Sequence, residues 1–519
     1  MRGNRNILTQ KLQIIKTEAR RLKNTKFYAL LITLTVLTGT LCLSPAVSSL
    51  INSVIIGCTG RIITEKSSII YKSEIRGVHI ADSIFAFPHN WSVIAETLAG
   101  YKINFVTVLL MGLPTSGRPD AEWRACIQAF HSRGIEVWIS YHVVGEMAVN
   151  DAYKIIDYQG NAVDWNDPCN PNFRQEVKAY VESVASTYDI DGIMFDYARY
   201  PGTGMPYTQY DKAAFEEWLN ETIPDSNWPP NPSDFAPGGS RYNEFMEWRT
   251  VPITNLIRDV RSWMLAINPN LKFGLAQWTL FGYSPDYSPT YWRYNIGQDT
   301  AYWVAQDYLD MVMPMMYDEP ATGEPHSVET DLLANWKYIT GGPEGKIPLI
   351  AFINTGYTYT GRDPAEVKAC IDKAREMGAD GWILWRYGGP GVDDDGYHID
   401  IRPYLNLLTM PDTFSIRNIQ VSLNATQATV TWKTDLPATS RIEYSTSPLF
   451  NATKKLSGNR YYWDIDYVGG TLIEDLNHVT SHSVTLKGLE PAQTYYFRIQ
   501  SQNEQGTATS KIFTFTVST

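Results

Sequence analysis

Two aspartates stand directly after apolar runs, at the position where a buried strand would present an acid. Asp196 follows the apolar residues 193–195 in the stretch DGIMFDYARYPG, and Asp318 ends the stretch DMVMPMMYD. Burial at the end of such a run raises the pKa of a carboxyl group unless a cation offsets the effect. Hydrolysis of a glycosidic bond usually needs two carboxyl groups, one protonated and one ionised. The pattern therefore predicts Asp196 as a catalytic carboxylate, with Asp318 as its partner.

Side chains able to hold a sugar stand near the ends of other apolar runs. Aromatic rings stack on sugar faces, whereas acids, amides and guanidinium groups bond the sugar hydroxyls. Arg199 is also close enough in sequence to be the cation beside Asp196. The residues predicted to bind substrate are Arg199, Tyr200, His142, Glu146, Trp278, Tyr317, Glu319, Trp385 and Arg386.

Other chemistries lack their sequence motifs. The five cysteines form no CxxC pair, and the histidines show no HxH or HExxH spacing, so no metal site is expected. The chain also lacks GxSxG, a P-loop and a GxGxxG after a strand, and no cofactor is expected. A net charge of −11 without a basic aromatic patch argues against a nucleic-acid partner.

Eight apolar, β-branched runs alternate with helical patterns between residues 75 and 410. The helical pattern at 363–378, for example, begins with Asp-Pro and ends with Gly. This alternation predicts an α/β fold, the (β/α)8 TIM barrel, whose active site lies at the C-terminal ends of the strands. Asp191 opens the fourth run and is expected at the opposite end, whereas 201–240 is expected to be a loop over the active-site end. The runs are 75–82, 103–112, 135–144, 191–200, 271–280, 310–318, 346–356 and 380–389.

Short alternating strands replace this pattern in residues 411–519. The stretch TVTWKTDLPATSRIEY and the later SHSVTLKGLEPAQTYYFRI resemble a fibronectin type III domain, a small all-β immunoglobulin-like sandwich. The spacing of Leu489, Pro491 and Tyr495 is similar to the corner before the sixth strand of that fold. The resemblance implies a spacer or adhesion module without catalytic residues of its own.

The N-terminus carries the features of export. Residues 1–26 are basic, and 27–58 are uncharged and apolar, as in a transmembrane signal-anchor or a cleaved signal peptide. IIGC before Thr59 also resembles a lipoprotein cleavage box at Cys58. All three interpretations place the rest of the chain outside the cytoplasm, with 59–74 as a linker to the catalytic domain at 75–410.

The stretch 166–201 resembles the glycosyl-hydrolase-like family 10 and related (β/α)8 glycosidases. The family pattern is Asp-Pro-x-x-Pro-x-x-Arg, a helix, and then Tyr-x-Val-Asp-Gly-Ile-x-Phe-Asp with a Tyr-Pro close. The resemblance implies hydrolysis of an amino-sugar polysaccharide, because characterised members include hydrolases of cell-wall glycan strands lacking stem peptides. The matching residues are Asp167, Pro168, Pro171, Arg174, Tyr188, Asp191, Gly192, Phe195, Asp196, Tyr200 and Pro201.

The chain departs from that pattern in two places. The family often carries a second aspartate where this chain has Tyr197, and a Gln-containing motif where it has PMMYD. The form FDYARYP is closer to a sister group of glycosidases. The partner of Asp196 must then come from another strand, which is the reason for choosing Asp318.

Family 18 chitinases offer a second comparison. Asp191, Asp196 and residues 315–318 agree with the chitinase patterns on the fourth and sixth strands. Met194 stands where chitinases have their middle aspartate, and Ala198 where they have the catalytic glutamate. The similarity is therefore interpreted as shared barrel geometry, in which Asp318 would orient an acetamido group.

These features predict an extracytoplasmic glycoside hydrolase, anchored to a membrane by its N-terminal segment or secreted, that acts on a cell-wall or extracellular polysaccharide. A second hypothesis is a catalytically inactive glycan-binding or adhesion protein of the cell surface, motivated by Ala198 and the fibronectin-like module. A third is an accessory protein for polysaccharide processing within a surface assembly. Release of reducing ends by the wild type separates the first hypothesis from the second.

Overall fold

The computed structural model describes most of the chain from residue 74 onward and two short strands before it. The strands are β1 (Ile62–Thr64) and β2 (Tyr71–Lys72). The other described residues are 74–80, 89–109, 120–145, 148, 150–229, 233–278, 295–317, 319–323, 327–340, 347–356, 361–390, 399–408, 410, 414–424, 426–457, 460–510 and 512–517.

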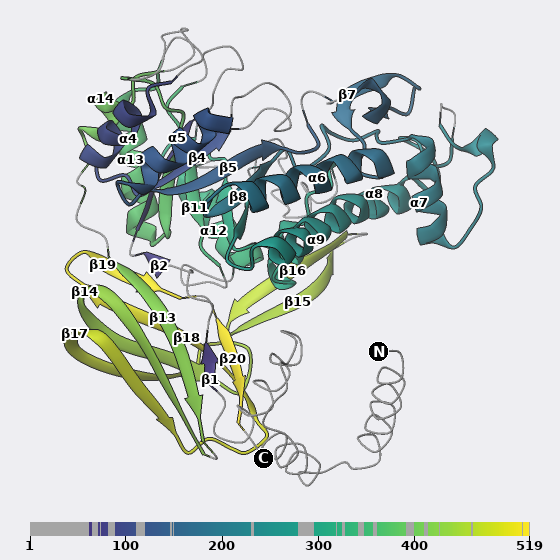
Figure 1. The fold of residues 1–519 in the computed structure, drawn as a ribbon. Helices are drawn as coiled ribbons and strands as arrows, with labels where there is room; N and C mark the ends of the chain where they lie inside the picture. Colours follow the sequence, from purple (N-terminus) through teal and green to yellow (C-terminus); the bar gives the residue numbers. More distant parts are fainter. Residues whose placement is uncertain are drawn as a thin grey trace, which may run out of the picture.

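Eight parallel strands form a nearly closed barrel, as the sequence predicts (Figure 1). Their order is β10-β9-β8-β5-β4-β3-β12-β11, and isolated bridges from Val312 to Leu349 and from Met315 to Phe352 join the first strand to the last. Each strand lies within one of the eight predicted runs. The strands are β3 (Ile75–Ile80), β4 (Phe105–Leu109), β5 (Glu136–His142), β8 (Gly192–Asp196), β9 (Lys272–Gln277), β10 (Met311–Pro314), β11 (Ile350–Asn354) and β12 (Gly381–Trp385).

Helices follow the strands and cover the outside of the barrel. In α13 the Asp363 side chain accepts a hydrogen bond from the backbone N–H of Ala365, Pro364 opens the first turn, and Gly378 closes the helix at a φ of +88°. Each residue has the local conformation that its type favours at a helix end. The helices around the barrel are α4 (Trp91–Gly100), α5 (Asp120–His131), α6 (Pro171–Thr187), α9 (Thr250–Ile267), α11 (Thr300–Ala305), α12 (Val328–Asn335), a π-helical turn (Trp336–Thr340), α13 (Pro364–Met377) and α14 (Arg402–Leu405).

The two faces of each barrel strand belong to two different hydrophobic clusters. In β8, Ile193 and Phe195 pack in the large cluster between strands and helices, whereas Met194 packs in the cluster inside the barrel. Trp138 and Phe352 occupy the same interior cluster. Because side chains alternate along a strand, the last residue of β8, Asp196, lies on the inward side.

The excursion between β8 and β9 forms a small core of its own. It contains α7 (Gln209–Leu219), a 3₁₀ turn (Asp225–Asn227) and α8 (Tyr242–Trp248). Its stacked rings include Tyr207 and Phe245, whose centroids lie 4.3 Å apart. The expectation of an irregular loop over 201–240 was therefore wrong in part, because aromatic residues spaced through this segment bury one another.

A short hairpin also leaves the barrel after β5. It consists of a 3₁₀ turn (Asp151–Tyr153), β6 (Lys154–Ile156) and β7 (Ala162–Asn166). It returns the chain to the active-site end of the barrel, since Asn166 N–H donates to the carbonyl of Val144 just beyond β5.

The C-terminal part is an antiparallel β-sandwich, as predicted. Its core contains Trp432 and Tyr495, and Tyr495 Oη accepts a hydrogen bond of 3.0 Å from the backbone N–H of Glu490, which forms the expected tyrosine corner. β1 and β2, from the segment predicted to be a linker, pair with β13 and extend this sheet. The strands are β13 (Ser415–Leu423), β14 (Gln427–Ser445), β15 (Phe450–Ser457), β16 (Arg460–Tyr467), β17 (Thr471–Lys487), β18 (Thr494–Asn503), β19 (Gly506–Thr509) and β20 (Phe513–Thr516).

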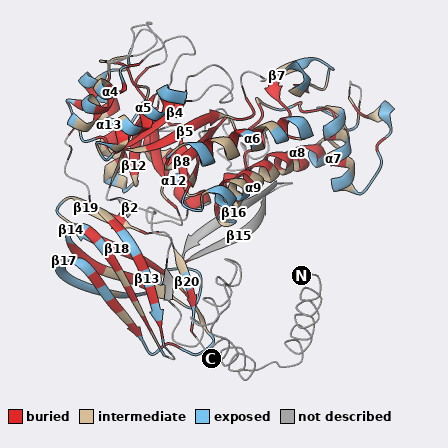
Figure 2. Cartoon of the chain, viewed as in Figure 1, coloured by how far each residue is buried: buried red, intermediate tan, exposed pale blue. Residues whose placement is uncertain are grey.

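The predicted membrane segment at 27–58 lies outside the described residues. Within the described part of the chain, none of the helices has both the length and the apolar character that crossing a membrane requires. Figure 2 shows that β4, β5 and β8 are buried along most of their length, whereas the helices around them expose their outer faces.

Replacing Gly192 with alanine should destabilise the barrel by about 1–3 kcal/mol through overpacking. A Cβ at this position would lie 2.5 Å from the indole of Trp138 and 2.9 Å from the carbonyl oxygen of Lys272. Gly202→Ala is the matched control, since its Cβ would meet no atom within 4 Å. Urea unfolding of both variants measures the difference, and equal stabilities would contradict this packing.

Candidate active site

The parallel register brings the polar strand ends together at one end of the barrel. His142, the last residue of β5, pairs with Asp196, the last residue of β8. On the other side, His79 of β3 pairs with both Thr107 of β4 and Trp385 of β12. Residues up to 306 positions apart in the sequence, such as His79 and Trp385, therefore become lateral neighbours.

Asp196 is the buried acid of this end. It is only 8% exposed, and its Oδ1 accepts a hydrogen bond of 2.7 Å from the backbone N–H of Tyr197. His142 Nε2 lies 3.7 Å from Asp196 Oδ2. Tyr197 has a φ of +53°, a left-handed conformation that is uncommon for a bulky residue and often marks a functional site.

Three of the predicted sugar-stacking rings meet at the same end. Trp278, Tyr317 and Trp385 are each partly buried and pack on the cluster that fills the barrel interior. The rings of Tyr317 and Trp385 lie 5.4 Å apart, and the guanidinium of Arg386 lies 5.2 Å from the Trp385 ring centroid. The Trp385–Arg386 peptide bond is cis. Together the rings line the barrel end that also carries Asp196.

Arg199 lies among aromatic rings. Its guanidinium is 4.1 Å from the ring centroid of Trp278, 4.8 Å from that of Tyr197 and 5.2 Å from that of Trp165. Cation–π contacts of this kind hold a buried guanidinium in place. His142 is one neighbour of the Asp196 carboxyl group, and the role of Arg199 as its cation stays a prediction.

His79 is a neutral group beneath this end of the barrel. Burial, together with the positive charges of His142 and Arg386, lowers its pKa from the ordinary 6.5 to about 3. Its Nδ1 lies 2.7 Å from Thr107 Oγ1, within hydrogen-bonding distance.

Two of the predicted substrate-binding residues, Tyr200 and Glu319, are buried. Tyr200 is fully buried, its backbone N–H donates to the carbonyl of Ile296, and the guanidinium of Arg249 lies 4.8 Å from its ring centroid. The structure packs Tyr200 against Arg249, and its assignment as a sugar contact stays a prediction. Glu319 is 6% exposed, and its carbonyl accepts a hydrogen bond of 2.9 Å from Arg362.

Two other predicted residues, Glu146 and Asp318, lie outside the described residues. Asp318 is bracketed by Tyr317 and Glu319, which follow β10 at the active-site end of the barrel. Both assignments stay predictions.

Sequence reasoning missed Trp165 and Tyr197. Trp165 comes from the hairpin after β5, and its ring lies 5.5 Å from that of Tyr197. The His142 ring is 4.6 Å from Tyr197 on the other side. The alternating stretch AVDWN was a local signal for β7, but its return to the barrel end depends on long-range contacts.

A second group of ionisable side chains lies beside α6 and α7. The ligand atoms of Asp167, Cys169 and Asp211 lie within 4.8 Å of one another, close enough to surround a cation. Thr208 Oγ1, however, is 2.7 Å from Asp167 Oδ2 and 2.8 Å from Asp211 Oδ2. A hydroxyl carries one proton, so these contacts are two separate two-centre hydrogen bonds only where one carboxyl group is protonated and donates. We interpret the group as two carboxyls sharing a proton.

The fold is a nearly closed (β/α)8 barrel that brings an acid, a histidine and several aromatic rings to one end. Residues 130–338 match the model of the family Glycosyl hydrolase-like 10, which confirms the resemblance predicted from the sequence. Residues 416–517 match the model of Purple acid Phosphatase, N-terminal domain, consistent with the fibronectin-like sandwich.

Two curated relatives are similar to parts of the chain. Glycosyl hydrolase YngK of Bacillus subtilis (strain 168) is 22% identical over 177 residues, covering 33% of this chain and 30% of that protein. An S-layer-related protein of Niallia circulans is 29% identical over 105 residues, covering 19% of this chain and 6% of that protein. The chain thus spans less than a third of the length of either relative.

Solved structures with a similar fold include two glycosidases. The PgaB (BpsB) glycoside hydrolase domain from Bordetella bronchiseptica is 12% identical, with 60% of this chain and 94% of that chain covered and a TM-score of 0.47. A β-galactosidase from Bacillus circulans sp. alkalophilus is 14% identical, with 64% and 55% covered and a TM-score of 0.48.

The shared proton predicts a pH-dependent stability. Burial raises the pKa of Asp167 from its ordinary 3.8 to about 6, and burial together with the charge of Asp167 raises the pKa of Asp211 well above its ordinary value. The folded chain then binds more protons here than the unfolded chain, so the free energy of unfolding falls as pH rises from about 4 through 6.

Asp211→Asn should remove this dependence. The melting temperature of the wild type should fall relative to that of the variant by on the order of a few °C between pH 4.5 and 8. Thermal unfolding followed by circular dichroism across this range measures the difference. Parallel pH profiles of the two proteins would rule out the shared proton.

Proposed function

We propose that the chain is an extracytoplasmic glycoside hydrolase that cleaves a cell-wall or extracellular polysaccharide, with an amino-sugar glycan favoured. The observation that carries the proposal is the buried Asp196 at the end of β8, beside His142, at the barrel end where Trp278, Tyr317 and Trp385 pack on the interior cluster. The family match over residues 130–338 supports the reaction class. The similarity to a glycosyl hydrolase and to an S-layer-related protein supports a site of action at the cell surface.

Asp196 is the catalytic carboxylate in this proposal. The backbone N–H of Tyr197 holds Oδ1 in place, so the carboxyl group has one orientation toward the substrate. Oδ2, the oxygen nearest His142 Nε2, is the atom that we assign to the reaction. A cationic His142 would stabilise the carboxylate, whereas a neutral His142 would let burial favour the protonated acid.

Asp318 is the proposed second carboxyl group. The ring of its neighbour Tyr317 lies against Trp385, so the chain at this point reaches the same end of the barrel as Asp196. A separation of about 5–5.5 Å between the two carboxyl groups would give retention of configuration, and about 6.5–9.5 Å would give inversion.

The aromatic residues position the sugar in this mechanism. Trp278, Tyr317 and Trp385 offer ring faces for stacking, and the guanidinium groups of Arg199 and Arg386 are held against these rings. A glycan bound there would displace water from around Asp196, which strengthens every electrostatic contact of the reaction.

Asp196→Asn should lower kcat by about 10²–10⁴-fold on a panel of cell-wall and extracellular glycans, because it removes the proton-transferring or nucleophilic group. The assay is release of reducing ends. Asp191→Asn is the matched control, since this residue stands at the opposite end of β8 and bonds the backbone N–H of Val137.

Full activity of Asp196→Asn would refute the assignment. Glycan binding by the wild type without any release of reducing ends would instead favour the catalytically inactive glycan-binding protein. The two results are distinct, since the first requires turnover and the second excludes it.

A further inference from the structure

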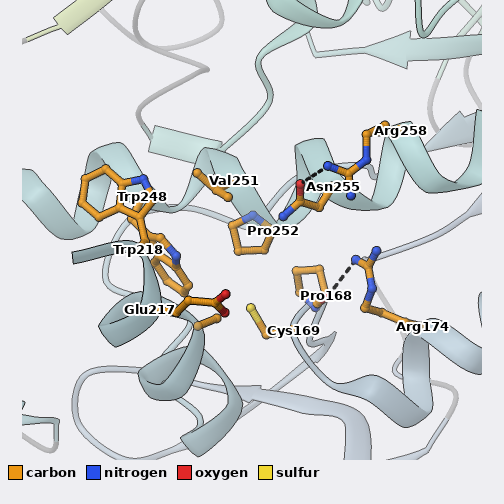
Figure 3. Close-up of a pocket in the computed structure, with 11 residues that line it drawn as sticks. Pro168, Cys169, Arg174, Glu217, Trp218, Trp248, Val251, Pro252, Asn255 and Arg258 are labelled. Carbon is orange, nitrogen blue, oxygen red and sulfur yellow. Dashed lines mark hydrogen bonds between the residues drawn. The ribbon is translucent and has the colours of Figure 1, made fainter. Parts of the chain in front are cut away.

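A cavity of about 500 Å³ lies outside the barrel, between α6, α7 and α9 (Figure 3). This volume is within the usual range for small-ligand sites, about 300–1,000 Å³. It shares none of its lining residues with the candidate active site. The residues that matter to the argument are Pro168, Arg174, Trp218, Trp248, Asn255 and Arg258.

One end of this outer pocket is aromatic. Trp218 of α7 is 43% exposed, although it stacks on Phe215 with 6.0 Å between ring centroids. Trp248 stands beside it and is almost fully buried. Trp218 therefore offers an indole face to solvent at the pocket's edge, supported from behind by the core of the excursion.

The other end of the outer pocket is polar. Asn255 and Arg258 lie one helical turn apart on α9, and Arg258 Nη1 donates a hydrogen bond of 2.9 Å to Asn255 Oδ1. Arg174 of α6 and Arg258 both pair with Asp259, so two guanidinium groups share a single carboxylate. Figure 3 shows Asn255, Arg258 and Arg174 on the side of the pocket opposite the two tryptophans.

Residues 167–174, which match the Asp-Pro-x-x-Pro-x-x-Arg pattern, form one wall of this pocket. Pro168, Cys169 and Arg174 line it, and the barrel-end mechanism uses none of them. Asp167 bonds to Thr208 just before α7, which ties this wall to the helix that carries Trp218. The pocket is thus held between segments that are fixed to each other.

We propose that the outer pocket is a second glycan-binding subsite, which takes one sugar residue of the same polysaccharide that the barrel end cleaves. Trp218 stacks on the sugar ring, while the amide of Asn255 and the guanidinium of Arg258 bind its oxygen atoms. An aromatic face opposite a few hydrogen-bonding groups suits a pyranose ring, which has an apolar face and a rim of hydroxyl groups. The inference rests on the proposed glycosidase function and adds a role in holding long glycan strands.

The test compares binding with turnover. Trp218→Ala should weaken binding of peptide-free cell-wall glycan strands by about 3- to 10-fold, as expected for loss of one aromatic stacking contact. Arg258→Gln, on the opposite wall, should weaken it similarly. Tyr210→Ala is the matched control, because Tyr210 is 44% exposed on the same helix and does not line the pocket. Co-sedimentation with the glycan strands measures binding. Turnover of short oligosaccharides measures the catalytic activity of the barrel end.

The outcomes separate the two proposals. Weaker strand binding by Trp218→Ala and Arg258→Gln, with unchanged turnover of short oligosaccharides, supports the subsite. If Trp218→Ala and Arg258→Gln bind glycan strands as well as Tyr210→Ala does, the subsite is overturned. The absence of saturable binding of glycan strands by the wild type also overturns it. Full activity of Asp196→Asn would overturn the proposed catalytic role of Asp196. The binding comparison would still test the subsite independently.

Discussion

The lateral pairing of β5 with β8 is the constraint on which the candidate active site depends. It sets His142 opposite Asp196, and the alternation of side chains along each strand turns both toward the barrel axis. Trp138 and Met194 fill the interior below them, so the acid stands at the end of a packed core. Gly192 makes this packing possible, because any larger residue there would overlap the indole of Trp138.

The excursion between β8 and β9 adds a second functional surface to the same barrel. Its rings form a separate core, which buries the inner side of α7. The contacts of the Thr208 hydroxyl with Asp167 and Asp211 join this core to the segment before α6. The proton shared there thus helps to hold the walls of the outer pocket.

Most of the fold could be predicted because its signals are local. The eight apolar runs, the Asp-Pro start and Gly stop of α13, and the tyrosine corner at Tyr495 each depend on residues close together in the sequence. The helices of the excursion and the pairing of β1 and β2 with β13 were missed. Their stability comes from partners distant in sequence, which periodicity does not reveal.

The sequence by itself determined that an acid follows the fourth strand and that aromatic residues follow the fifth, sixth and eighth, since strand alternation assigns each position to a face. Only the tertiary structure decided which of these side chains meet. It set His142 beside Asp196, enclosed Arg199 within three rings and buried Tyr200 against Arg249. The physical reason is that barrel closure and the turns after each strand choose the contacts, and both depend on residues tens to hundreds of positions apart.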